Sequence, residues 1–107
     1  MGGMKPHELF AALSDRTRMD IFEHLASSGP ASATELARSM PVSRQAVARH
    51  LSVLDDAGLV TRFPAGREVR YSARPAALGS VVSWVNEVGD EWDHRLDLLR
   101  RAVDDAP

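Results

Sequence analysis

Apolar residues recur every three or four positions along most of this chain, which is the spacing of one buried face on a helix. Two stretches depart from it, residues 59–63 and 68–72, and their β-branched and aromatic content predicts two strands around Pro64-Ala65-Gly66-Arg67. The helical spacing covers residues 6–13, 16–27, 32–40, 43–57 and 76–103. The expected fold is therefore mainly α with a small β-hairpin, in the order α-α-α-α-β-β-α.

Cap and break signals divide the helical part of the chain. Asp15, after Ser14, offers an N-cap, and Ser28-Gly29-Pro30 is a stop signal. Ser32-Ala33-Thr34-Glu35 is a capping box, and Pro41-Val42 precedes a further cap at Ser43. The third and fourth helices are thus about three residues apart, which is helix-turn-helix spacing. The hairpin that follows corresponds to a wing. The apolar positions expected to form the core of the second and third helices are Met19, Ile21, Phe22, Leu25, Leu36, Ala37 and Met40.

The fourth helix has the pattern of a DNA recognition helix. Its apolar residues form one stripe, and its polar residues lie off that stripe. Arg and Gln side chains match the edges of bases in the major groove. Gly58 suits a left-handed cap at the end of this helix. The stripe consists of Ala46, Val47, Leu51 and Leu54, and the polar positions are Arg44, Gln45, Arg49 and Ser52.

Composition and charge are consistent with one small DNA-binding domain over residues 1–107. The net charge is only −2, but residues 31–75 hold seven arginines against four acidic residues, whereas residues 76–107 hold three against seven. The basic middle, which includes Arg62, Arg67 and Arg70 in the predicted hairpin, would face a polyanion. The chain has no cysteine and no apolar run long enough to cross a bilayer. A cytoplasmic location is expected.

The last helix carries more apolar surface than so short a chain can cover. We expect it to pack, together with the first helix, against the same helices of a second copy. A monomer with a folded-back helix is the alternative. The residues expected at the dimer interface are Leu9, Phe10, Leu13, Leu78, Val81, Val82, Val85, Trp92, Leu96 and Leu99.

These motifs together resemble the ArsR/SmtB family of winged helix-turn-helix bacterial repressors. The resemblance extends from about Glu8 to Arg100. It rests on the order and spacing of five stretches: Phe10-Ala-Ala-Leu-Ser-Asp-Arg-Thr-Arg-Met-Asp-Ile, Glu35-Leu-Ala-Arg, Val42-Ser-Arg-Gln-Ala-Val-Ala-Arg-His-Leu, Leu54-Asp-Asp-Ala-Gly-Leu-Val and Gly66-Arg-Glu-Val-Arg-Tyr.

The resemblance implies a dimer on a pseudo-palindromic operator, usually released by a ligand. The cysteines that metal sensors of the family carry on the third helix are absent here, where the chain has Glu35-Leu-Ala-Arg-Ser. Asp90 and His94 could both touch a metal, but a second His is missing from the last helix, so no metal and no cofactor is expected. The chain is more similar to the subgroup without known metal ligands.

Several residues allow two interpretations. Ser43 and its neighbouring amides could bind a phosphate, and Arg67 should reach backbone phosphate or the minor groove. His50 is expected to be a structural, hydrogen-bonded histidine, and Arg16 an internal ion-pair or capping residue, with DNA contact as the alternative for each. Trp84 and Trp92 are expected in the dimer core, although they could line a pocket for an apolar effector.

The function expected from the sequence is therefore that of a homodimeric, sequence-specific DNA-binding regulator, acting as a repressor. Its DNA contacts would come from Ser43, Arg44, Gln45, Arg49, Arg62, Arg67 and Arg70. Its partners would be operator DNA, a second copy and an effector that the sequence does not identify. The alternative is a winged-helix protein-interaction module. No nucleophile lies beside a base, and no phosphate-cradling loop is present, so an enzyme is not expected.

Overall fold

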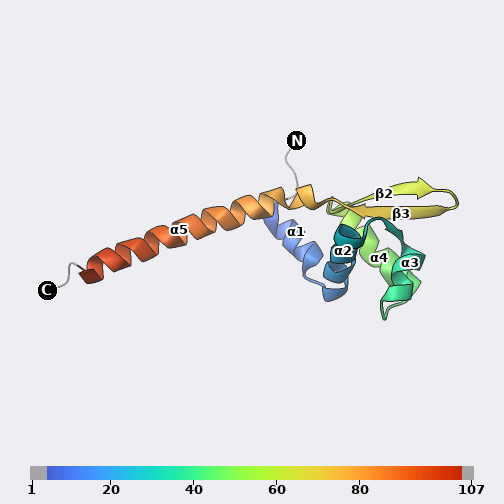
Figure 1. Cartoon of the computed structure of the whole chain (residues 1–107), viewed down its shortest axis with the longest axis horizontal. Coiled ribbons are helices and arrows are strands. Elements are labelled where there is room, and N and C mark those ends of the chain that lie inside the picture. Colours follow the sequence, from blue (N-terminus) through green and yellow to red (C-terminus); the bar gives the residue numbers. More distant parts are fainter. Residues whose placement is uncertain (1–4, 105–107) are drawn as a thin grey trace.

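The computed structural model describes residues 5–104 and shows four short helices, a small sheet and one long C-terminal helix (Figure 1). The predicted order of helices and hairpin is confirmed. In chain order the elements are α1 (Pro6–Leu13), α2 (Arg16–Ser28), β1 (Ala31–Ser32), α3 (Ala33–Ser39), α4 (Arg44–Asp56), β2 (Val60–Ala65), β3 (Glu68–Ala73), the 3₁₀ helix η1 (Pro75–Leu78) and α5 (Gly79–Asp104).

The predicted caps hold the helix ends. Asp15, Ser32 and Ser43 each accept a hydrogen bond from the backbone N–H three residues on, at 3.1 Å in every case. These bonds satisfy amides that a helix start leaves without partners. At the end of α4, Gly58 has φ +75°, and the amides of Gly58 and Leu59 donate to the carbonyls of Asp55 and Leu54, which is a Schellman motif.

The sheet has three antiparallel strands in the order β1-β3-β2. The sequence did not predict β1, which is two residues long and pairs with β3 in the register Ala31 with Tyr71 and Ser32 with Arg70. In the hairpin, Ala65 pairs with Glu68, so the turn consists of Gly66 and Arg67. Gly66 has φ +66°, and Gly-X with a positive φ on Gly alone fits a type II′ turn.

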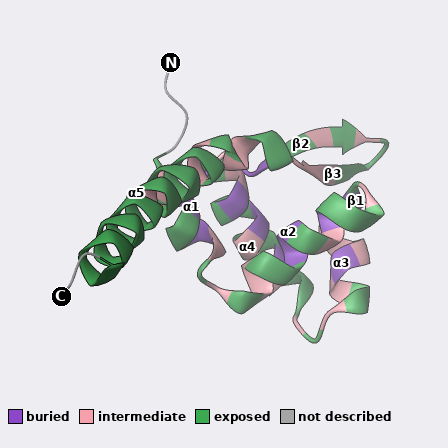
Figure 2. Ribbon diagram, turned by 60° about the vertical axis from the view of Figure 1, so that its left-hand side comes forward, coloured by how far each residue is buried: buried purple, intermediate pink, exposed green. Residues whose placement is uncertain are grey.

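One hydrophobic core lies among α1, α2, α3, α4 and the start of β2 (Figure 2). The predicted stripe of α4 faces it: Val47, Leu51 and Leu54 are fully buried, and Ala46 is half-buried. The prediction that Met19 belongs to the core is wrong. This side chain is 40% exposed, because α2 turns only Ile21, Phe22 and Leu25 inward.

The C-terminal helix leaves the body of the protein. The chain measures 74 × 34 × 20 Å and has a radius of gyration of 19.4 Å, against about 13 Å for a compact domain of this size. The helix predicted over residues 76–103 is present, but its first turn is the 3₁₀ helix η1 and the α-helix begins at Gly79. Only the start of α5 lies beside α1, and the rest projects freely (Figure 1). Within residues 5–104 no helix is long and apolar enough to cross a membrane.

Candidate nucleic-acid interface

The exposed face of α4 carries the predicted polar residues. Arg44, Gln45 and Arg49 are all exposed, on the side opposite the buried stripe. Arg44 and Gln45 stand in the first turn, directly after the cap at Ser43. The first turn of a recognition helix is the part that contacts base edges in the major groove. The Ser43 hydroxyl oxygen already accepts the Ala46 amide, so this side chain is held as a cap.

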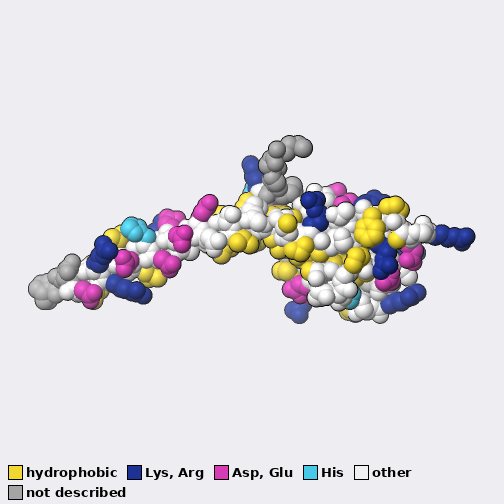
Figure 3. All heavy atoms as spheres, turned by 45° about the horizontal axis from the view of Figure 1, so that its top comes forward, with side chains coloured by type: hydrophobic (Ala, Val, Ile, Leu, Met, Phe, Trp, Pro, Cys, Tyr) yellow, Lys and Arg dark blue, Asp and Glu magenta, His cyan; other side chains and the backbone are white. Residues whose placement is uncertain are grey.

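Arg44 and Arg49 have no anionic partner among residues 5–104. Among residues 5–104, the arginines that form ion pairs are Arg70, Arg95 and Arg101. Arg44, Arg49, Arg62 and Arg67 form none, and all four are exposed. An unpaired guanidinium can give all its donors to an external phosphate or base. In Figure 3, Lys and Arg side chains project around the globular end, and one extends past the end that carries the hairpin turn.

The hairpin forms the predicted wing. Arg67 occupies the second position of its two-residue turn, and Arg62 lies on β2 opposite Tyr71. A turn at the end of a two-stranded ribbon lets Arg67 extend away from the domain body. The geometry is that expected of a side chain that reaches DNA beside the recognition helix.

Arg70 is placed differently from the other predicted DNA contacts. Its Nη2 donates to the carbonyl of Pro30 at 2.9 Å and lies 3.4 Å from the carboxylate of Glu35. Its Nε is buried without a hydrogen-bond partner in the described part of the chain. Arg70 therefore ties β3 to the start of α3. The sequence could not show this, because it follows from the pairing of β1 with β3.

The residues at the junction of α1, α2 and α4 form a second hydrogen-bonded group. His50 is half-buried, and its Nδ1 lies 3.4 Å from Arg18 Nη1, as expected for a structural histidine. Arg18 also donates to the carbonyl of Ala12 from Nε at 2.6 Å. The prediction that Arg16 is an internal ion-pair or capping residue is wrong. Arg16 is exposed, and Arg18 makes the internal contacts instead. The amide of Arg18 donates to Asp15, and this bond lowers the pKa of that carboxyl below its ordinary value.

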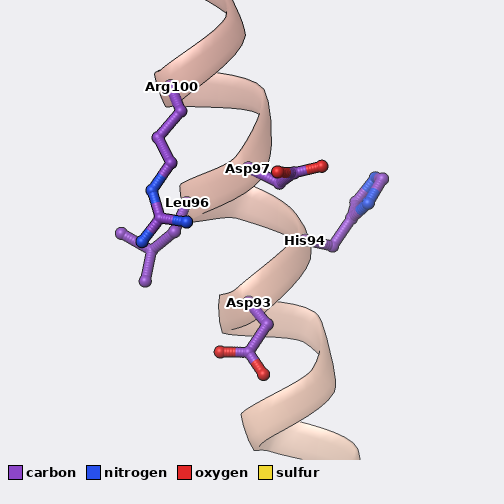
Figure 4. A pocket seen from close by; sticks show the side chains of 5 residues that line it. All are labelled: Asp93, His94, Leu96, Asp97 and Arg100. Carbon is purple, nitrogen blue, oxygen red and sulfur yellow. The ribbon is translucent and has the colours of Figure 1, made fainter.

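The acidic residues of α5 do not come together as metal ligands. Figure 4 shows Asp93, His94 and Asp97 extending from one helix without meeting at a common point, with Arg100 on another side, and all four side chains are exposed. Residues 5–104 contain no group of three or more His, Cys, Asp or Glu side chains that could hold a metal ion.

The predicted dimer residues fall into three groups. Leu9 is fully buried in the protomer and belongs to its own core, not to a surface that a second copy could cover, which corrects the prediction for this residue. Leu13, Leu78 and Val81 are partly buried against the same core. The other six are exposed by 43–63%: Phe10, Val82, Val85, Trp92, Leu96 and Leu99.

The two tryptophans lie in different surroundings. Trp84 meets Phe10 of α1 edge-on, with ring centroids 5.6 Å apart, beside a hollow of about 390 Å³ also lined by Lys5, Pro6 and His7. Trp92 lies farther along α5, with the Arg95 guanidinium 5.3 Å from its ring centroid. Both are about half exposed, so neither is a core residue of the protomer.

Comparison with known proteins agrees with this geometry. A family model described as a helix-turn-helix domain matches residues 13–62. An HTH-type transcriptional regulator of Mycobacterium tuberculosis is 46% identical over 76 residues, which are 71% of this chain and 70% of that protein. The arsenical resistance operon repressor of Escherichia coli is 29% identical over 91 residues, which are 85% of this chain and 74% of that protein.

Solved structures give the same result over more of the chain. The structure of an ArsR-like transcriptional regulator from Rhodococcus sp. RHA1 superposes with a TM-score of 0.80 at 42% identity and covers 91% of each chain. The predicted fold class and the expectation of a DNA-binding regulator that is not an enzyme are thereby confirmed. This chain belongs to the ArsR/SmtB family of winged helix-turn-helix transcriptional regulators.

Proposed function

We propose that the protein acts as a homodimeric repressor on a pseudo-palindromic operator. The observation that carries this proposal is the set of exposed, unpaired arginines on two neighbouring elements, α4 and the hairpin. Arg44 and Gln45 would read bases, Arg49 would contact the operator farther along α4, and Arg62 and Arg67 would contact its backbone or minor groove. Two copies related by a two-fold axis would present two such surfaces to two half-sites.

The argument for a second copy rests on α5. Six of its exposed apolar residues, together with Gly89, are spaced alternately by three and four positions, which is the a/d spacing of a coiled-coil seam. This seam comprises Val82, Val85, Gly89, Trp92, Leu96, Leu99 and Val103. Most of it has no covering element in the protomer (Figure 2). Exposed apolar surface of this extent is typical of an interface.

The hollow beside Phe10 and Trp84 continues this apolar surface onto α1. A second copy that packs on α1 and α5 would cover it. We therefore assign Phe10 and Trp84 to the dimer interface, and an apolar effector would have to compete with the partner for the same side chains.

Repression is proposed from the relatives. One is named the arsenical resistance operon repressor, and another, a Bacillus subtilis protein 26% identical over 90 residues, is named a transcriptional repressor. A repressor needs only to occupy its operator, which two recognition helices and two wings are sufficient to do.

The test is a binding titration with fluorescence anisotropy. The purified protein is titrated against a duplex from the region upstream of its own gene and against a scrambled duplex, at low and physiological salt. We expect tight binding to the first duplex that persists in salt. Arg44→Ala should cost about 1–3 kcal/mol on the upstream duplex and much less on the scrambled one.

The control for Arg44→Ala is Arg101→Ala, an exposed arginine near the end of α5, which projects away from the recognition helix (Figure 1). Equal, weak binding to both duplexes that disappears with salt would contradict sequence-specific regulation. A protein-interaction module would then explain the fold better.

A further inference from the structure

A groove of about 290 Å³ lies between the start of α3, the start of α4 and the hairpin. Thr34 of α3, Arg44 of α4, and Arg67, Glu68 and Tyr71 of the hairpin line it. The groove exists because β1 pairs with β3 and leads directly into α3. Three segments distant in sequence thus meet at one hollow.

The position of this groove has a consequence for any DNA bound as proposed above. Neighbouring major and minor grooves of a duplex are separated by one backbone strand. If α4 lies in the major groove and the hairpin turn reaches the adjacent minor groove, that strand must cross the surface between them. The surface between α4 and the hairpin is this groove.

The side chains in the groove suit a phosphate. Arg67 lines the groove from the hairpin and Arg44 lines it from α4, and neither forms an ion pair within residues 5–104. The Thr34 hydroxyl is a further donor, and among residues 5–104 it forms no hydrogen bond. Hydroxyl and guanidinium donors are the usual partners of DNA phosphate oxygens.

Glu68 is the one acidic side chain in the groove. It is exposed, and among the ion pairs of residues 5–104 its carboxylate takes part in none. A carboxylate held beside a phosphate repels it, so Glu68 opposes the attraction of Arg67 for that phosphate.

We infer that this groove seats one backbone phosphate of the bound DNA, held by Arg67 and Thr34, and that Glu68 weakens this contact. Arg44 lines the groove on the α4 side, and its guanidinium is left to the bases. The inference rests on the proposed DNA-binding function and adds to it a determinant of the sequence-independent part of the affinity. A phosphate contact strengthens binding to every sequence alike. By reducing that sequence-independent part, Glu68 lowers the affinity for operator and non-operator DNA by the same factor, while base reading by α4 is unaffected.

The first experiment measures Glu68→Gln against the scrambled and the upstream duplex. We expect both affinities to rise by the same factor, about two- to five-fold, since exposed charges contribute modestly. Glu87→Gln is the matched control. It makes the same change in net charge, but on α5, which packs mainly against α1 and η1. Equal effects of the two variants would overturn the role of Glu68.

The second experiment locates the phosphate. Single methylphosphonate linkages, which are neutral, are placed in turn along the upstream duplex. At one position we expect the neutral linkage to lower the affinity of the wild-type protein for the duplex. The same linkage should lower the affinity of Thr34→Val by a smaller factor and the affinity of Glu68→Gln by a larger factor. Thr34→Val itself should lose about two- to ten-fold in affinity, the effect of one hydroxyl hydrogen bond.

If no linkage shows this dependence on Thr34 and Glu68, the groove does not seat a phosphate, even where the upstream duplex is bound specifically. If the wild type does not prefer the upstream duplex, the proposed operator function fails. The scrambled duplex then still tests Glu68, so the two failures can be told apart.

Discussion

Arg18 and His50 join the first two helices to the recognition helix, with 3.4 Å between Arg18 Nη1 and His50 Nδ1. Arginine can only donate, so His50 Nδ1 is the acceptor in this contact. The same guanidinium donates to the carbonyl of Ala12 at 2.6 Å and to that of Ala11 at 3.5 Å, at the end of α1. One side chain thus fixes α1, which carries part of the proposed dimer surface, relative to α4.

Arg18→Lys should destabilise the protein by about 1–3 kcal/mol, because a single ammonium group cannot replace three donors aimed at two helices. The free energy of unfolding from urea titration measures this. Arg16→Lys is the matched control, since Arg16 lies in the same first turn of α2 and is exposed. Equal, small losses for both variants would contradict the role assigned to Arg18.

Asp15 gives the protein a pH dependence at the acid end. The hydrogen bond from the Arg18 amide holds the pKa of this carboxyl below its ordinary value. A depressed pKa in the folded state means that the carboxylate stabilises the fold above the ordinary value, and that this contribution is lost as pH falls below about 4.

The comparison of wild type with Asp15→Asn isolates this effect, because asparagine keeps the cap but does not titrate. We expect the wild type to melt at a higher temperature than the variant near neutral pH, and the difference to shrink as the pH is lowered. A difference that stays constant down to acid pH would show that Asp15 contributes no charge-dependent stability.

Much of the fold followed from local signals in the sequence. The stripe Val47, Leu51 and Leu54 determined which face of α4 is buried, and the caps at Asp15, Ser32 and Ser43 are where the side-chain chemistry placed them. Each of these features depends on residues within about one or two helical turns, so the sequence contains the whole cause.

The features that were missed depend on how elements pack together. Strand β1 is too short for any periodicity and exists only because β3 lies beside it. Arg16 and Arg18 are equivalent as sequence signals, and the angle between α1 and α2 decides which of them turns inward. The groove that contains Thr34 and Glu68 is formed by three separate segments, so no local motif indicates it.

Arg70→Ala should separate a structural from a DNA-contacting role. Loss of the bonds to Pro30 and Glu35 is expected to cost about 1–2 kcal/mol of stability. The slope of log affinity against log salt should stay as in the wild type. Arg67→Ala should instead leave stability unchanged and reduce that slope by about one. A reduced slope for Arg70→Ala would restore the original prediction that Arg70 contacts DNA.

The seam of α5 provides the sharpest test of the dimer. Leu96 and Leu99 lie on the seam and are 46% and 63% exposed, whereas Leu98 is 50% exposed but lies off it. Replacing both Leu96 and Leu99 by Glu should produce a monomer. Burying two carboxylates in the interface costs far more free energy than burying the methylene groups of the two glutamates contributes. Leu98→Glu should remain a dimer.

Light scattering coupled to size-exclusion chromatography measures both masses, and the fold of each variant is checked by its helical circular dichroism. Because these leucines contact little else in the protomer, the monomeric variant should keep its helix-turn-helix and lose affinity for the two-fold operator more than for a single half-site. Dissociation caused equally by Leu98→Glu would show that α5 associates without the a/d register, and a wild type that is already monomeric would exclude the proposed homodimer.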